Sequence, residues 1–176
     1  MKRIAIIGPE STGKTTMAKM LAAHYKTIIV PEYAREYIMQ LNRPYSPKDL
    51  LPIAKGQIQL ENQLLFQANR LLICDTNMTV MKVWSEYKYG FCAEWILNVI
   101  NSRYYDHHFV CAPDMPWDAD PLREHPNKRE ELFDIYIEEM KKQQVRYTVL
   151  RGTPEERLAQ MTEVLDKYIL KKNKNA

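Results

Sequence analysis

Glycine is scarce in this sequence, which contains 5 glycines among 176 residues, whereas soluble proteins average ~7%. Two of the five, Gly8 and Gly13, fall within one short segment near the start of the chain. A sequence with so few glycines is expected to place them where the backbone requires them. We therefore expect a backbone-determined loop in this segment.

Cysteine is also scarce, and Cys74, Cys92 and Cys111 are widely spaced. Their odd number and the lack of a CxxC pair exclude a disulfide scaffold and a zinc module. No apolar run approaches the ~20 residues of a membrane span, and no secretory signal pattern opens the chain. The sequence thus predicts reduced thiols, a cytoplasmic localisation and no membrane partner.

Net charge is low, because 25 Lys and Arg residues face 22 Asp and Glu residues for a formal charge of +3. So small and dispersed a charge predicts no nucleic-acid partner. The one basic cluster, formed by Lys171, Lys172 and Lys174, is interpreted as a solvated helix end. With no repeat and no linker, residues 1–176 are predicted to form a single domain.

Short β-branched runs alternate with longer amphipathic stretches, which predicts crossover units and an α/β fold around a parallel sheet. The predicted strands are 3–7, 27–30, 71–74, 109–111 and 147–150. Helices are predicted at 14–25, 31–41, 47–69, 79–87, 93–104 and 128–144, and after Thr153. Ser46 and Thr153 are each followed by proline and then an acid at the third helical position, the pattern of a capping box.

The first strand leads into a segment that satisfies the phosphate-loop pattern G-x-x-x-x-G-K-[ST]. In such a loop, backbone N–H groups and a helix N-terminus surround a polyphosphate. A chance match is the alternative, but strand, glycines, lysine and helix are all in register. The predicted nucleotide-binding residues of the loop are Gly8, Pro9, Glu10, Ser11, Thr12, Gly13, Lys14, Thr15 and Thr16.

Lys14 and Thr15 are expected to serve phosphate and metal, with the lysine near the β- and γ-phosphates and the hydroxyl on Mg²⁺. Asp75 ends an apolar strand, at the edge where ligands sit in open parallel sheets. It is therefore a candidate catalytic carboxylate and metal ligand. The alternative for Asp75 is a turn or helix-cap aspartate.

Two guanine-binding patterns are missing, since neither D-x-x-G after the third strand nor N-K-x-D occurs. The proline-rich stretch at about 113–130 instead carries Arg123 and Arg129. Small-molecule kinases exclude water with a lid, and lid arginines stabilise charge on the transferred phosphoryl group. The alternative is a solvated loop in which Arg129 pairs with a nearby glutamate.

Arg157 follows the turn after the last strand, and its guanidinium could lie over an adenine. An ordinary strand-to-helix turn explains the segment equally well. The acceptor side is predicted around Glu32, which could accept a proton from a hydroxyl or bind ribose. Glu32 and Arg35 could equally be a surface pair on a helix.

Further candidates for substrate binding combine aromatic rings, cations and polar groups. Core packing is the alternative for Trp84, and the four histidines lack metal-ligand spacing and receive no role. The full set of candidate substrate-binding residues is Glu32, Tyr33, Arg35, Asn77, Lys82, Trp84, Trp117 and Asp120.

Six segments then suggest a family. They are Gly-Pro-Glu-Ser-Thr-Gly-Lys-Thr-Thr from residue 8, Pro-Glu-Tyr-Ala-Arg-Glu-Tyr from 31, Ala-Lys-Gly-Gln from 54, Cys-Asp-Thr-Asn from 74, Lys-Val-Trp-Ser from 82 and Pro-Trp-Asp-Ala-Asp-Pro-Leu-Arg-Glu from 116. In this order they resemble the ribosylnicotinamide kinase domain of NadR-type proteins. The family's best-known members also carry a nucleotidylyltransferase domain, and some a DNA-binding domain, and we expect neither within these 176 residues.

The resemblance implies a P-loop kinase fold, a three-layer sandwich of five parallel strands with an arginine-bearing lid. It implies ATP- and Mg²⁺-dependent phosphorylation of the ribose 5′-hydroxyl of nicotinamide riboside. Another nucleoside or small alcohol as acceptor stays open, as does a non-catalytic sensor that binds ATP. The sequence also leaves open whether Glu32 or Asp75 is the base, which of Trp84 and Tyr33 stacks the substrate ring, and whether the chain forms a homo-oligomer.

Overall fold

A computed structural model describes residues 1–120 and 123–170. Five parallel strands form one sheet in the order β2-β3-β1-β4-β5, which confirms the predicted fold class. The strands are β1 (Lys2–Ile7), β2 (Ile29–Val30), β3 (Leu71–Asp75), β4 (His107–Cys111) and β5 (Tyr147–Leu150). The tail lysines 171, 172 and 174 lie outside the described residues.

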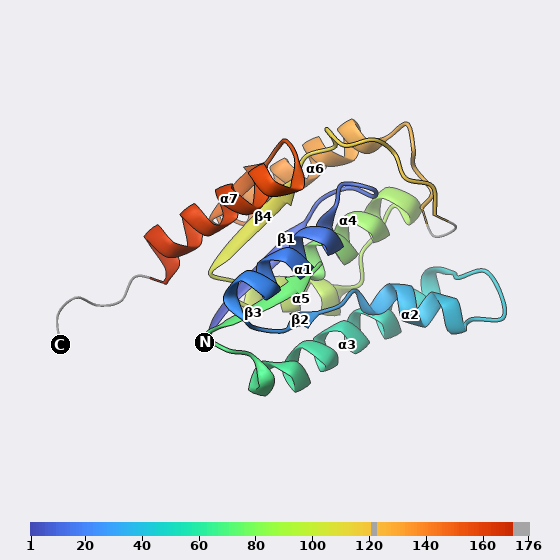
Figure 1. The fold of residues 1–176 in the computed structure, drawn as a ribbon. Helices are drawn as coiled ribbons and strands as arrows, with labels where there is room; N and C mark the ends of the chain where they lie inside the picture. Colours follow the sequence, from blue (N-terminus) through green and yellow to red (C-terminus); the bar gives the residue numbers. More distant parts are fainter. Residues whose placement is uncertain (121–122, 171–176) are drawn as a thin grey trace.

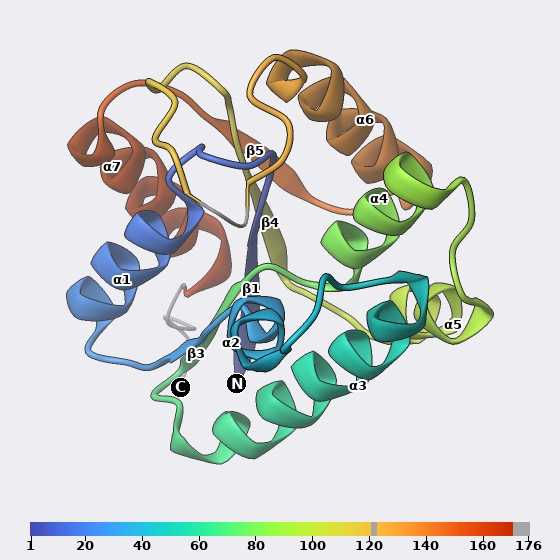
Figure 2. The same cartoon turned by 90° about the vertical axis from the view of Figure 1, so that its right-hand side faces the viewer.

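Helices cover both faces of the sheet, with α1 and α7 on one face and α3, α4 and α6 on the other, while α5 packs against α3 and α4 (Figure 2). Their bounds are α1 (Lys14–Tyr25), α2 (Tyr33–Gln40), α3 (Pro47–Leu64), α4 (Met78–Tyr89), α5 (Glu94–Ser102), α6 (Arg129–Lys142) and α7 (Pro154–Val164). A 3-10 turn (Leu65–Gln67) extends α3, and a π turn (Leu165–Ile169) extends α7.

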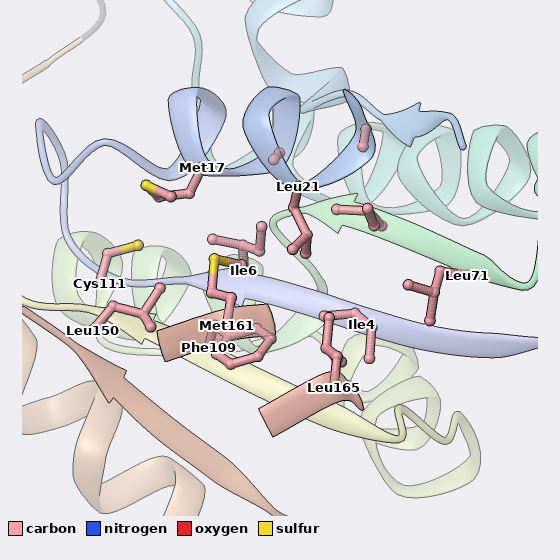
Figure 3. Packing of buried hydrophobic residues seen from close by; sticks show 13 residues of the cluster. Ile4, Ile6, Met17, Leu21, Leu71, Phe109, Cys111, Leu150, Met161 and Leu165 are labelled. Atoms are coloured by element: carbon pink, nitrogen blue, oxygen red, sulfur yellow. The ribbon is translucent and has the colours of Figure 1, made fainter. Parts of the chain in front are cut away.

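The core lies between the central strands and these helices. On the first face, Ile4 and Ile6 of β1 pack with Leu21 of α1 and with Met161 and Leu165 beyond them (Figure 3). All are fully buried or nearly so. Consecutive β1 residues face opposite sides of the sheet, and both sides are covered. This double burial explains why the strand is a continuous apolar run in sequence.

Both predicted capping boxes are present. The Asp49 carboxylate accepts a hydrogen bond from the Ser46 backbone N–H at 2.7 Å. The Thr153 hydroxyl accepts from the Glu156 N–H, and the Glu156 carboxylate accepts in return from the Thr153 N–H. Reciprocal bonds of this kind satisfy N–H groups that the helix itself leaves unpaired.

Some predicted boundaries differ from the structure. The strand predicted at 27–30 is limited to Ile29–Val30, because the Thr27 hydroxyl, rather than a strand ladder, bonds the Leu71 carbonyl at 2.7 Å. β4 begins earlier than predicted, since His107 and His108 are buried in the sheet although their side chains are polar. Within the described residues, no helix is both long and apolar enough to cross a membrane.

Figure 1 shows that the loop before α1, the start of α2 and the segment before α6 gather at one end of the sheet. This is the end toward which the strands run, away from the N-terminus. The fold therefore places the candidate functional segments together, although they lie far apart in sequence.

Candidate active site

The loop between β1 and α1 follows the backbone of β4 closely. A Cβ on Gly8 would lie 2.7 Å from the Cys111 carbonyl oxygen, closer than real side chains approach a backbone. Gly13, the residue before α1, has a φ of 81°, in the left-handed region that favours glycine. Both glycines of the phosphate-loop motif thus stand where the backbone requires them.

Polar groups of this loop are satisfied internally. The Pro9 carbonyl accepts hydrogen bonds from Lys14 Nζ at 2.7 Å and from the Thr12 hydroxyl at 2.8 Å. Lys14 is held by a neutral carbonyl, although an ammonium group forms a stronger bond with an anion. A phosphate in the loop would therefore draw Lys14 away from Pro9.

Asp75 lies beside the loop at the carboxyl end of β3. Its Oδ2 accepts a hydrogen bond from the Thr15 hydroxyl at 2.6 Å, whereas its Oδ1 is buried without a partner. Burial raises the pKa of this carboxyl group, against the opposing effects of the Thr15 hydrogen bond and the nearby Lys14. An unpaired buried carboxylate oxygen is costly for the fold, so it indicates a ligand.

The donors at this point fit Mg²⁺. Thr15 and Asp75 supply a hydroxyl and a carboxylate, hard oxygen ligands of the kind that Mg²⁺ prefers. Mg²⁺ commonly uses one or two protein carboxylates and completes its shell with water and substrate phosphate oxygens. Among the described residues, no cluster of three or more His, Cys, Asp or Glu side chains could hold a metal alone.

Glu32 lies between β2 and α2, where it precedes the first residue of the helix. None of the described residues donates a hydrogen bond to its carboxylate. Burial raises the pKa of Glu32, and Asp75 and Glu10 raise it further, while Lys14 and Arg35 act in the opposite direction. A carboxyl group of this kind suits proton transfer, since a raised pKa makes a better base near neutral pH.

A cavity of about 420 Å³ lies between the phosphate loop and Glu32. It is lined by the whole predicted loop from Gly8 to Thr16, by Glu32 and Arg35, and by Trp84 of α4. Tyr33 does not line it, because its ring packs over Gly56 of α3, where a Cβ would lie 2.1 Å from the Tyr33 ring. Of the two aromatic candidates for stacking, only Trp84 therefore faces this cavity.

The segment before α6 lies against the phosphate loop. Arg129 donates to the Ser11 carbonyl at 3.2 Å and to the Met115 carbonyl at 2.8 Å, instead of pairing with a glutamate. Arg123 lines the cavity and contacts the Ser11 hydroxyl at 3.4 Å and the Asp118 carboxylate at 3.0 Å. Both arginines thus lie close to the loop, and residues 121 and 122 of the predicted lid lie outside the described residues.

Arg157 differs from the prediction that its guanidinium lies over an adenine. Its side chain is fully buried and donates to the carbonyls of Thr12, Ala112 and Gly152 at 2.7, 3.0 and 3.0 Å. It also pairs with Asp114. With its donors occupied and its side chain buried, Arg157 stabilises the phosphate loop and is not available to stack on a ligand.

Several predicted substrate-binding residues lie outside this cavity. Asn77 caps α4, with its Oδ1 accepting from the Thr79 N–H at 3.0 Å. Lys82 points toward α6 and pairs with Glu139 at 2.8 Å. The Trp117 ring lies 5.8 Å from the Arg129 guanidinium. Asp120 pairs with Arg35, so Arg35 does not form the predicted alternative pair with Glu32.

Several cavity residues were missed by the sequence reasoning, among them Tyr45, Glu124, His125 and Tyr136. Tyr136 of α6 is almost fully buried, and burial, with Glu32 and Glu10 adding to it, raises the pKa of its hydroxyl. In sequence Tyr136 belongs to the apolar face of an amphipathic helix, so it is indistinguishable from a core residue. Tyr45 carries no motif, and Glu124 ends the segment quoted from residue 116 without a predicted role; only the fold brings the two together.

A family model described as an AAA domain matches residues 3–157, and the chain belongs to this family. A curated relative is the trifunctional NAD biosynthesis/regulator protein NadR of Escherichia coli K12, which is 24% identical over 155 residues. That match covers 84% of this chain and 37% of the relative. The chain therefore spans little more than a third of that relative's length.

Two solved structures share the fold. A NadR protein in complex with NR has a TM-score of 0.80 at 18% identity, covering 97% of this chain and 51% of that one. A thymidylate kinase from Ehrlichia chaffeensis has a TM-score of 0.67 at 16% identity, covering 94% and 98% of the two chains. The predicted P-loop kinase fold is thereby confirmed.

Proposed function

We propose that this chain is an ATP- and Mg²⁺-dependent kinase that phosphorylates the ribose 5′-hydroxyl of nicotinamide riboside to give nicotinamide mononucleotide. The observation that carries the proposal is one cavity lined by the phosphate loop, the Glu32 carboxylate and the Trp84 ring. The relationship to NadR and the likeness to a NadR structure with NR support the choice of acceptor.

The donor occupies the phosphate loop in this proposal. Backbone N–H groups of the loop and the N-terminus of α1 surround the phosphates, and Lys14 moves from the Pro9 carbonyl to the β- and γ-phosphates. Thr15 and Asp75 would hold Mg²⁺, which neutralises charge on the phosphate oxygens when bound.

Glu32 serves the acceptor. The 5′-hydroxyl oxygen attacks the γ-phosphorus, the bond from that phosphorus to the bridging oxygen of ADP breaks, and the hydroxyl proton passes to Glu32. Asp75 is the weaker candidate for the base, because its Oδ2 already accepts from Thr15. The free Glu32 carboxylate and its raised pKa favour Glu32 in this role.

The lid at 113–130 excludes water in the proposed reaction, so that the phosphoryl group reaches the acceptor rather than solvent. Arg123 and Arg129 stabilise charge on the transferred group once the donor displaces their present contacts. Trp84 stacks on the nicotinamide ring, since an aromatic face attracts a cationic ring. We place this single domain of residues 1–176 in the cytoplasm, in keeping with its three unpaired cysteines.

The test is the ATP-dependent formation of nicotinamide mononucleotide, measured by mass spectrometry beside a panel of other nucleosides. We expect product from nicotinamide riboside and a loss of about 10²- to 10⁴-fold in kcat for Glu32→Gln, the usual size of a general-base effect. Glu36→Gln is the matched control, because Glu36 lies on α2 outside the cavity, with Gln40 as its hydrogen-bond partner at 3.2 Å.

Three other outcomes are informative. Product from another nucleoside alone would support the kinase activity and show that the acceptor is not nicotinamide riboside. Tight ATP binding without acceptor-dependent turnover would indicate a nucleotide sensor instead. Full turnover by Glu32→Gln would remove Glu32 from the role of the base.

A further inference from the structure

Glu124 of the lid is held from the donor side by its backbone. The Glu10 carboxylate, which belongs to the phosphate loop, accepts hydrogen bonds from the Glu124 N–H at 2.9 Å and the His125 N–H at 3.0 Å. Its other oxygen lies 3.6 Å from the His125 ring. Any shift of Glu10 when a nucleotide enters the loop would therefore move this part of the lid.

The side chain of Glu124 is held from the opposite side of the cavity. Both oxygens of the Glu124 carboxylate lie 2.7 Å from Lys88 Nζ, and one accepts from the Tyr45 hydroxyl at 2.9 Å. Lys88 belongs to α4, and Tyr45 lies in the loop between α2 and α3. One residue thus joins three segments that are distant in sequence.

The same group of hydrogen bonds includes Trp84, the predicted stacking residue. The Tyr45 hydroxyl accepts from the Trp84 indole N–H at 3.2 Å and from Lys88 at 2.5 Å, and it donates to Glu124. A phenol has one proton to donate and two lone pairs, so this hydroxyl is fully used. The Tyr45 and Trp84 rings also meet edge to face, with centroids 5.1 Å apart. The position of Glu124 therefore constrains the orientation of Trp84.

We propose that Glu124 is a positioning residue that couples the two substrates, so that a nucleotide in the phosphate loop strengthens acceptor binding at Trp84. This inference rests on the proposed function, since it requires a donor and an acceptor. Nothing in the contacts requires Glu124 to touch either substrate. It acts by joining Glu10, which lines the donor site, to Tyr45 and Trp84, which line the acceptor site.

The electrostatics of the group support a defined geometry. Burial raises the pKa of Glu124, but the hydrogen bonds from Lys88 and Tyr45 outweigh it and leave the pKa below its ordinary value. Glu124 is therefore ionised at neutral pH and forms charge-assisted bonds, which hold their partners more tightly than neutral ones. Coupling between two binding sites is reciprocal, so the acceptor must strengthen donor binding by the same factor.

The experiment measures the Kd of nicotinamide riboside by calorimetry, with and without saturating AMP-PNP and Mg²⁺. The ratio of the two values is the coupling factor, and the reverse titration must return the same factor. We expect at least about a fivefold ratio in the unaltered protein, the lower end of typical allosteric couplings. Glu124→Gln and Lys88→Met should reduce the ratio to below about twofold, whereas Lys88→Arg, which keeps the cation, should restore most of it.

The matched control is Glu138→Gln, the same chemical change at an exposed glutamate of α6 that does not line the cavity. We expect it to leave the coupling factor unchanged. A purely structural role for Glu124 would change the separate affinities or the melting temperature and leave the ratio as it is.

The outcomes separate the two proposals. An unaltered coupling factor in Glu124→Gln, in a protein that still phosphorylates the riboside, would overturn the coupling and leave the proposed function intact. Absence of riboside binding and turnover in the unaltered protein would overturn the proposed function and the coupling with it.

Discussion

The two ends of the sheet differ in how a buried carboxylate is paired. At the end where the strands begin, the buried Glu61 carboxylate receives hydrogen bonds from Arg103 at 3.0 Å and from the Tyr105 hydroxyl at 2.8 Å. Arg3 Nε lies 3.8 Å from the same carboxylate, beyond hydrogen-bond distance, and is buried without a hydrogen-bond partner. At the end where the strands finish, Asp75 has an unpaired oxygen.

We interpret the paired Glu61 carboxylate as a group that stabilises the fold, and the partly unpaired Asp75 carboxylate as a group that binds a ligand. A paired buried charge is costly to break, because removal of one partner leaves the other unsatisfied. An unpaired buried polar atom costs stability, and beside the phosphate loop the ligand-binding role that we propose for Asp75 explains it. Substitutions at the two ends should therefore move stability and activity in different directions.

Asp75→Asn gives the largest effect on activity. We expect a loss of about 10³-fold or more in kcat, since the amide cannot supply the anionic oxygen that Mg²⁺ prefers. The free energy of unfolding should rise by roughly 1 kcal/mol, because a neutral side chain carries less of the desolvation penalty that raises the Asp75 pKa. Steady-state kinetics and urea denaturation measure the two. A loss of both activity and stability would contradict the comparison.

Glu61→Gln should have the opposite profile. We expect a loss of about 3–5 kcal/mol in the free energy of unfolding, since the change breaks a buried ion pair and leaves Arg103 without its counter-charge. The kcat of the molecules that remain folded should stay within about twofold, because Glu61 lines no part of the cavity. Urea denaturation gives the first value, and turnover per folded molecule at low temperature gives the second. Gln63→Glu, at an exposed position of the same helix, is the control.

The sequence was most informative where the functional pattern is contiguous. The loop from Gly8 to Thr15 carries its own strand, glycines and helix, so local spacing determines where its backbone goes. Arg157 was placed differently because its burial depends on Ala112 and Asp114, which are distant in sequence. Tyr136 was missed because helical periodicity cannot separate a core-facing side chain from one that lines a cavity within the core.

Two buried histidines at the start of β4 make the stability of the fold sensitive to acid. Burial lowers the pKa of His107 and of His108 to about 4, from an ordinary value of 6.5. Between pH 6.5 and pH 4 the two histidines are protonated in the unfolded chain but neutral in the folded chain. The stability that the two histidines contribute is therefore present above pH 6.5 and is lost as the pH falls toward 4. We expect a loss on the order of 2 kcal/mol for each histidine across this range.

Thermal unfolding of the protein and of His107→Gln, measured from pH 7 to pH 4, would test this. Glutamine cannot take up a proton, and its amide can still bond the Thr148 hydroxyl that His107 contacts at 2.8 Å. The stability difference between the two proteins should therefore shift in favour of His107→Gln as the pH falls. Parallel curves would show that His107 titrates normally in the folded chain.

The smallest effect is expected for Lys128→Met, at the same end of the molecule as Asp75. Its charge pairs with Glu131 at 2.9 Å, but both side chains are about half exposed, and solvent screens exposed pairs so strongly that many contribute nothing measurable. We expect no resolvable change in urea denaturation and a kcat that stays within about twofold. A charge at the functional end is therefore not important by location alone. If Lys128→Met lowered activity as strongly as Asp75→Asn, location rather than unpaired burial would decide which charges matter, and the contrast between the two ends would lose its physical basis.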